Sequence, residues 1–124
     1  MKKNYNELSK KLCGLLGLSA RARKLICGSD LVCDAVRTGR TAMVLVATDA
    51  SANTKKRVFN CCIHYECECR EVPIKSSELA HQLGKSGLTA GVALTDHHMI
   101  KGIRKVFEEF DTVKDTADRG SREV

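Results

Sequence analysis

The sequence contains no tryptophan, one proline, few aromatic residues and no long hydrophobic run. Its five Phe and Tyr residues are too few to form a base-stacking platform of the kind that binds single-stranded nucleic acid. The longest apolar segment, Ala42–Ala47, has six residues, whereas a membrane-spanning helix needs about twenty. Polar residues rather than an apolar segment follow Lys2 and Lys3, which argues against a signal peptide, so we expect a cytoplasmic protein.

The length and composition are those of one globular domain. The 124 residues are 43% apolar and 29% charged, and no linker, repeat or low-complexity segment divides them. The apolar periodicity stops after Phe110. We therefore predict a single domain over residues 1–110 and a flexible C-terminal tail over residues 111–124.

The net charge of +6 is unevenly distributed along the chain. Residues 1–57 carry 12 basic and 4 acidic side chains, a net charge of +8, and the remainder has a net charge of −2. A polyanion such as a phosphate backbone fits this asymmetry, because each neutralised phosphate releases counterions. A basic surface that only keeps the protein soluble fits it equally well. Since aromatic residues are scarce, a nucleic-acid partner would be a shaped, partly duplex RNA.

Hydrophobic periodicity predicts alternating helices and strands. The predicted helices begin after Asn4, around Ser29, after Asp49 or Ser51, at Ser76 or Ser77, and after Asp96. Three of them are expected to end at Gly17, Gly39 and Gly84. The predicted strands are Leu25–Cys27, Met43–Ala47, Cys67–Val72 and Thr89–Leu94, and Met43–Ala47 should be central because it is apolar throughout. This alternation favours a largely parallel sheet with helices on both faces.

Seven cysteines raise the question of a metal site. The densest group combines Cys61, Cys62, His64, Cys67 and Cys69, but structural zinc sites usually draw on paired C-x-x-C segments. Here the first pair should end a helix and the second should lie along a strand. We therefore favour reduced, buried thiols over a metal site or a disulfide. The same interpretation applies to the other cysteines, Cys13, Cys27 and Cys33.

No catalytic constellation is present in the sequence. Gly84–Ser86 matches the end of a phosphate-binding P-loop, but Leu79 occupies the position of its first glycine and a helix precedes it. Gly84–Gly87 also matches the G-x-x-G pattern of a nucleic-acid-binding clamp. A flexible turn is the simpler interpretation of these two glycines. No histidine is placed for a relay. We therefore expect no enzymatic activity, no cofactor and no small-molecule substrate.

One segment has the properties of a phosphate-binding site. Gly28, Ser29 and Asp30 open the second predicted helix, and three basic residues precede them. A helix N-terminus presents unpaired N–H groups, and a glycine lets a phosphate backbone approach closely. An ordinary helix cap with a glycine turn is an equally good interpretation.

Several motifs in one order resemble a known family. They are Leu18–Leu25, Gly28, Ala35–Gly39, Met43–Ser51 and Asn53–Lys56. Over roughly residues 5 to 105 the chain resembles the small bacterial YlxQ-like proteins, within the superfamily of kink-turn RNA-binding ribosomal proteins of the archaeal and eukaryotic seven-A type. The resemblance implies an α/β fold, a three-layer α/β/α sandwich with a mixed, largely buried four-stranded sheet. It also implies RNA binding without catalysis, through the start of the second helix and the loop before the last strand.

The residues at the expected RNA contact differ from the family pattern. In kink-turn binders the glycine is followed by an Asn-Glu pair and, three residues later, by a lysine. Gly28 matches the glycine, whereas Asp30, Leu31 and Asp34 replace the other three. Carboxylates repel phosphates, and a leucine cannot read a guanine edge. A protein interaction module that has kept the fold but lost kink-turn recognition is therefore the alternative.

The sequence thus predicts a non-catalytic monomer that binds structured RNA, ribosomal or kink-turn-containing. Backbone groups at the second helix and the loop before the last strand would contact the RNA, and basic side chains would contact phosphates. The predicted RNA-binding residues are Arg21, Arg23, Lys24, Gly28, Ser29, Asp30, Leu31, Asp34, Arg37, Arg40, Lys85, Ser86, Gly87, Leu88 and Thr89.

Overall fold

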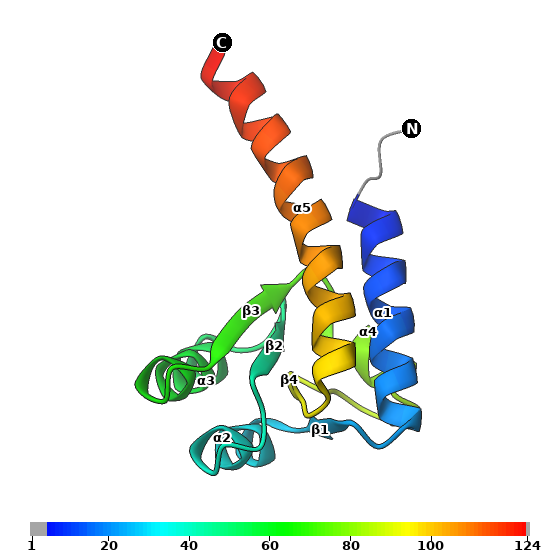
Figure 1. Cartoon of the computed structure of the whole chain (residues 1–124), viewed down its shortest axis with the longest axis vertical. Helices are drawn as coiled ribbons and strands as arrows, with labels where there is room; N and C mark the ends of the chain where they lie inside the picture. Colours follow the sequence, from blue (N-terminus) through cyan, green and yellow to red (C-terminus); the bar gives the residue numbers. More distant parts are fainter. Residues whose placement is uncertain (1–4, 124) are drawn as a thin grey trace.

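A computed structural model describes the backbone of residues 5–123 and the side chains of residues 6–112. Four strands form one sheet in the order β1-β4-β2-β3 between two layers of helices (Figure 1). The strands are β1 (Leu25–Cys27), β2 (Met43–Ala47), β3 (Glu68–Val72) and β4 (Gly91–Leu94). The helices are α1 (Tyr5–Arg21), α2 (Ser29–Arg37), α3 (Ala52–His64), α4 (Ser76–Gln82) and α5 (His97–Glu123). The predicted α/β/α sandwich with a mixed four-stranded sheet is confirmed.

Strand β2 divides the core into two halves. All five of its side chains are fully buried. Met43 and Leu45 pack with α1, α4 and α5, whereas Val44 and Val46 pack with α2 and α3 on the other face. Alternate residues of a strand point to opposite faces, so a strand covered on both faces must be apolar throughout. The continuous apolar run therefore correctly predicted a central strand.

The direction of β4 corrects the prediction of a largely parallel sheet. Strands β1, β2 and β3 run in one direction, and β4 runs against them, so two of the three strand pairings are antiparallel. Gly91, the first residue of β4, pairs with Val46 near the end of β2. The helix α4 has only seven residues, so after it the chain is still at the end of the sheet where β3 ends. Because the chain does not return to the other end, β4 must run back antiparallel.

Two predicted helix boundaries were wrong. Gly17 does not end α1, which continues to Arg21. A Cβ at Gly17 would lie 3.4 Å from the carbonyl oxygen of Gln82, so this glycine lets α1 approach the end of α4 closely. Neither Ser76 nor Ser77 caps α4, because Lys75 occupies the N-cap position. By contrast, Ser51 caps α3 as predicted and accepts a hydrogen bond from the Thr54 N–H at 3.1 Å.

Helix α5 packs on the sheet through one apolar face. Ile103, Phe107 and Phe110 are buried at the predicted helical spacing. The helix continues past Phe110 to Glu123, and Asp111 accepts a hydrogen bond from Arg70 at 2.7 Å. The predicted tail therefore begins inside this helix, and the division of the chain at residue 110 stays a prediction. Among the described helices, none is both long and apolar enough to cross a bilayer.

Candidate nucleic-acid interface

The start of α2 and the loop before β4 lie side by side. Strand β1 ends where β4 begins, with Cys27 paired to Val92. The Gly28 N–H donates to the Gly91 carbonyl at 3.0 Å, which ties the two segments together. We call residues 28–31 and 84–89 the glycine end of the sheet. One open hollow there is lined by Cys27, Gly28, Ser29, Lys85, Leu88, Thr89 and Ala90.

Gly28 shapes the start of α2. It occupies the N-cap position with φ +102°, a conformation that side chains with a Cβ rarely adopt. A Cβ built there would have no neighbour within 4 Å, so this side of the glycine is open. The Val32 N–H donates to the Gly28 carbonyl at 2.9 Å, the first hydrogen bond of the helix. The N–H groups of the first turn of α2, before Val32, have no acceptor within the helix and are available to an external acceptor.

The loop before β4 is anchored at both ends and open between them. The Lys85 N–H donates to the Ala80 carbonyl at 2.8 Å, and the Thr89 N–H donates to the Ser76 carbonyl at 3.1 Å. Thr89 is buried, whereas the side chains of Lys85 and Leu88 are exposed. The loop thus holds a fixed shape and presents a charge and an apolar side chain.

Asp49, which the sequence offered only as a helix cap, supports this loop. Its carboxylate accepts hydrogen bonds from both the N–H and the hydroxyl of Ser76, each at 2.7 Å. These hydrogen bonds lower the pKa of Asp49 below its ordinary value. Since the Ser76 carbonyl holds Thr89, Asp49 connects the loop after β2 to the loop before β4. An aspartate two residues after a buried strand was the available sequence signal.

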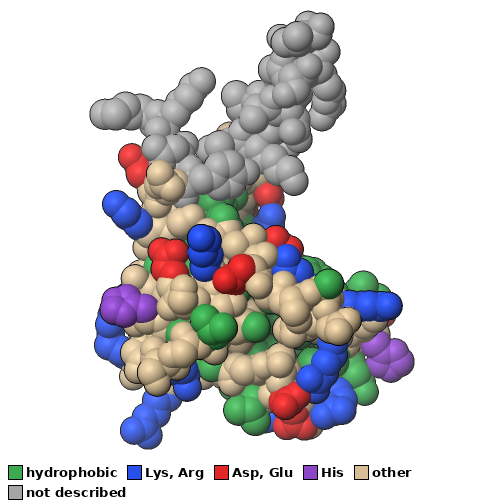
Figure 2. All heavy atoms as spheres, turned by 180° about the vertical axis from the view of Figure 1, so that it is seen from behind, with side chains coloured by type: hydrophobic (Ala, Val, Ile, Leu, Met, Phe, Trp, Pro, Cys, Tyr) green, Lys and Arg blue, Asp and Glu red, His purple; other side chains and the backbone are tan. Residues whose placement is uncertain are grey.

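The two aspartates of α2 form ion pairs with arginines. Asp30 pairs with Arg57 of α3. Asp34 pairs with Arg40 at 2.8 Å and with Arg37 at 3.6 Å. Acidic and basic side chains accordingly lie side by side over α2 and α3, at the lower right of Figure 2. The charges expected to repel phosphates are therefore partly neutralised, and Arg57 is a contributor that the sequence reasoning missed.

Most of the predicted basic contacts lie away from the glycine end. Arg21, Arg23 and Lys24 precede β1, whereas Gly28 follows it, about 13 Å further along the strand. Arg37 is the last residue of the nine-residue helix α2, and Arg40 follows it in the segment before β2. The structure thus brings the segment Gly28–Leu31 together with Lys85–Thr89. It places Asp34 one turn further along α2 and does not bring the five basic residues to this hollow.

Two large apolar side chains are exposed at the glycine end. Leu31 is 60% exposed on the first turn of α2, and Leu88 is 74% exposed in the loop. Burial of such side chains against a partner would be favourable, because it removes apolar surface from water. Both are suited to contact an apolar group of a partner.

The cysteines are free thiols in this structure. Cys13, Cys33 and Cys62 are buried, and the others are partly buried. Burial raises the pKa of Cys13 to about 11 and that of Cys67 to about 12, so these side chains are protonated at neutral pH. Among the described residues, no three His, Cys, Asp or Glu side chains are grouped as metal ligands.

A helix start and an anchored loop thus lie together at one end of an α/β/α sandwich. Residues 10–104 match the ribosomal protein L7Ae/L30e/S12e/Gadd45 family. The chain belongs to this family, as its sequence motifs predicted.

Relatives and solved structures agree with this family. The chain is 40% identical over 82 residues to the RNA-binding protein YlxQ of Bacillus subtilis (strain 168), covering 66% of this chain and 80% of that protein. It is 35% identical over 98 residues to the RNA-binding protein YlxQ of Enterococcus faecium, covering 79% and 92%. A protein of unknown function from Bacillus halodurans C superposes with a TM-score of 0.70 at 31% identity, covering 82% and 97% of the two chains. The Giardia lamblia 15.5kD RNA binding protein, at 17% identity, shares the fold with a TM-score of 0.69, covering 90% and 92%.

Proposed function

We propose that this protein binds structured RNA at the glycine end of its sheet and performs no catalysis. The observation that carries the proposal is the contact between the open start of α2 and the anchored loop, fixed by the 3.0 Å hydrogen bond from Gly28 to Gly91. Family membership and the names of the two bacterial relatives support RNA as the partner.

Each part of the glycine end has a role in this proposal. The first-turn N–H groups of α2 donate to phosphate or base oxygens, because a helix N-terminus carries partial positive charge. The exposed ammonium of Lys85 contacts a phosphate from the loop side. Leu31 and Leu88 pack against a base that leaves the helical stack. Apolar contact of this kind tolerates any base, so shape rather than sequence governs recognition.

A kink-turn is the RNA that we propose for this surface. The resemblance implies that the loop at residues 85–90 lies near a nucleotide extruded by the kink. Asp30, in place of the usual asparagine, accepts hydrogen bonds only, so it suits base amino groups. Its ion pair with Arg57 reduces its repulsion of nearby phosphates. We propose that the protein acts in the cytoplasm as a monomer on ribosomal or other kink-turn-containing RNA.

The alternative is a protein interaction module on the same fold. The exposure of Leu31 and Leu88 beside an acidic residue is the observation that favours it, because apolar side chains with a polar rim suit a protein partner.

Electrophoretic titration with two RNAs tests the proposal. One RNA carries a kink-turn, and the other has its G·A pairs replaced by Watson–Crick pairs. We expect tighter binding of the kink-turn RNA and roughly tenfold weaker binding by Lys85→Gln, since one phosphate contact is lost. Lys56→Gln, at an exposed position on α3, is the matched control and should bind normally. Equal affinity for both RNAs, together with protein partners that persist after ribonuclease treatment, would favour the interaction module.

A further inference from the structure

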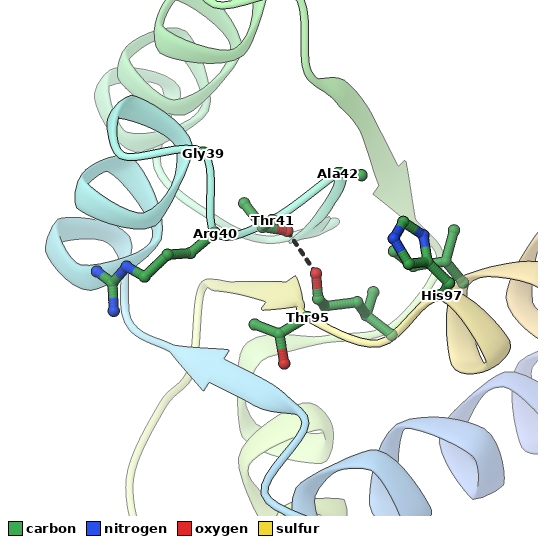
Figure 3. Close-up of a pocket in the computed structure, with 8 residues that line it drawn as sticks. Gly39, Arg40, Thr41, Ala42, Thr95 and His97 are labelled. Carbon is green, nitrogen blue, oxygen red and sulfur yellow. Dashed lines mark hydrogen bonds between the residues drawn. The ribbon is translucent and has the colours of Figure 1, made fainter.

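Three separate segments that carry basic residues come together at the other end of the sheet. The Thr95 N–H donates to the Lys24 carbonyl at 3.1 Å, which joins the segment before β1 to the end of β4. Thr95 lines one small pocket with Arg40, before β2, and His97, at the start of α5 (Figure 3). Lys101 follows one turn later on the exposed face of α5. We call this surface the basic end, with the residues Arg21, Arg23, Lys24, Arg40, His97 and Lys101.

The backbone of this surface is held in place. The Thr41 hydroxyl donates to the Leu94 carbonyl at 2.6 Å, the contact drawn in Figure 3. The Met43 N–H donates back to the same hydroxyl at 3.2 Å. The segment that carries Arg40 is therefore fixed against β4, so the charges do not depend on a loose loop for their positions.

Two of the acidic residues nearby, Asp34 and Glu68, are paired, whereas Asp96 forms no ion pair within residues 6–112 and adds one negative charge to this surface. Asp34 binds Arg40 and Arg37, and Glu68, at the start of β3, binds Arg104 at 2.9 Å. Within residues 6–112, no ion pair joins Arg21, Arg23, Lys24 or Lys101 to a carboxylate, and all four are exposed. Basic side chains project into solvent at the lower left of Figure 2, the side on which α1 ends. The basic end thus carries a net positive charge, because four exposed cations outnumber the one unpaired carboxylate, Asp96.

The shape of this surface indicates an extended polyanion. The pocket at its centre has a volume of about 110 Å³, well below the roughly 300 Å³ or more of sites for organic ligands. The exposed cations come from the end of α1, the turn before β1 and the start of α5, and none of these four lines the pocket. Successive phosphates of a nucleic-acid strand match charges that are spread over a surface in this way, whereas a single small anion does not.

We propose that the basic end is a second RNA-backbone contact, which binds a segment of RNA that the glycine end does not hold. This inference rests on the proposed function. Lys24 and Gly28 lie at opposite ends of β1, about 13 Å apart, so one phosphate cannot reach both. The glycine end recognises a folded element, and the basic end binds a flanking stem of the same RNA or a second RNA.

Paired variants and two lengths of RNA test this second contact. The first RNA is a minimal kink-turn, and the second carries the same kink-turn with a long flanking duplex. Arg21→Gln with Lys24→Gln removes two charges from the basic end, and Lys10→Gln with Lys56→Gln removes two charges elsewhere. We expect the first pair to weaken binding of the long RNA about 10-fold to 100-fold and to reduce the slope of log K against log salt by about two. The control pair should leave both RNAs tightly bound.

A third arm identifies the source of the RNA segment. A labelled plain duplex is added to the complex with the minimal kink-turn. A ternary complex that Arg21→Gln with Lys24→Gln abolishes indicates a second RNA molecule, and loss confined to the long RNA indicates a flanking stem. Either result supports the second contact.

Two results would overturn it. One is an equal loss on the minimal and the long RNA, which would place Arg21 and Lys24 in the first site. The other is behaviour identical to that of the control pair. Failure of the proposed function looks different, because Lys85→Gln would then leave binding of the minimal kink-turn unchanged.

Discussion

The two ends of the sheet present different chemistry, and we propose that both contact RNA. The glycine end presents backbone N–H groups and two exposed leucines, with Lys85 as the cation of its loop. The basic end presents long, exposed cationic side chains on a fixed backbone. Backbone groups discriminate shape because their geometry is rigid, whereas flexible cations add affinity to any phosphate backbone. The comparison teaches that net charge and recognition need not lie on the same surface of a small protein.

Truncation of a buried side chain in the central strand should destabilise both ends of the sheet together. Leu45 is fully buried in β2, which lies between the two faces of the sandwich and runs from one end to the other. We expect Leu45→Ala to lower the free energy of unfolding by about 2–5 kcal/mol, because it leaves a cavity. Chemical denaturation measures this loss. An unfolding midpoint equal to that of the wild type would contradict the account of the core.

Substitution of the helix-start glycine should damage the glycine end alone. Gly28→Ala places a Cβ on a residue at φ +102°. We therefore expect the free energy of unfolding to fall by about 1–3 kcal/mol and the kink-turn RNA to bind more weakly. Gly14→Ala is the control, because Gly14 is exposed within α1 and a Cβ there meets nothing within 4 Å. This control should be neutral or slightly stabilising. The salt dependence contributed by the basic end should not change with Gly28→Ala.

Loss of the Asp49 carboxylate should loosen the loop side of the glycine end. Asp49→Asn removes the charge that accepts the two hydrogen bonds of Ser76, so the thermal midpoint should fall at pH 7. The pKa of Asp49 is lowered in the folded protein, so its stabilisation is present above its ordinary pKa near 3.8 and is lost as the pH falls through the folded value. The gap between the thermal midpoints of wild type and variant should therefore narrow as the pH falls below 3.8. A gap that does not depend on pH would contradict the role of the carboxylate.

The smallest effect is expected for the ion pair at the start of α2. Asp30 and Arg57 are both exposed, so their contact contributes little to folding. Asp30→Asn should leave the thermal midpoint almost unchanged and should strengthen binding of the kink-turn RNA a few-fold, because one negative charge leaves the phosphate-facing surface. Titration at low salt measures the change. The amide of the variant keeps an acceptor oxygen for base amino groups, so weaker binding would show instead that the negative charge strengthens those hydrogen bonds more than it repels phosphates.

Local patterns correctly predicted most of the fold. The apolar run of β2 predicted a central strand, and the spacing of Ile103, Phe107 and Phe110 predicted the buried face of α5. Gly17 was wrongly predicted to end α1. Its role is to allow the close approach of α4, which is distant in sequence. The antiparallel direction of β4 was not predicted either. The alternation of helices and strands gives the order of the elements but does not show at which end of the sheet a strand begins.

The candidate site was predicted only in part, because it too depends on contacts between segments that are distant in sequence. Gly28 and the loop at residues 85–89 were identified by a motif and a resemblance, and the structure brings them together. Arg21 and Lys24 were grouped with Gly28 because they are close in sequence. A strand lies between them, so closeness along the chain became separation in space.

By itself, the sequence determined the family through its ordered motifs, the alternation of helices and strands through periodicity, and the excess of positive charge in the first half of the chain through composition, because all three are local properties. Only the tertiary structure decided where that charge lies. Strand β1 carries the chain from the basic end to the glycine end, and the antiparallel β4 places the second loop beside Gly28. Pairings between distant strands fix these positions, and no local pattern encodes them.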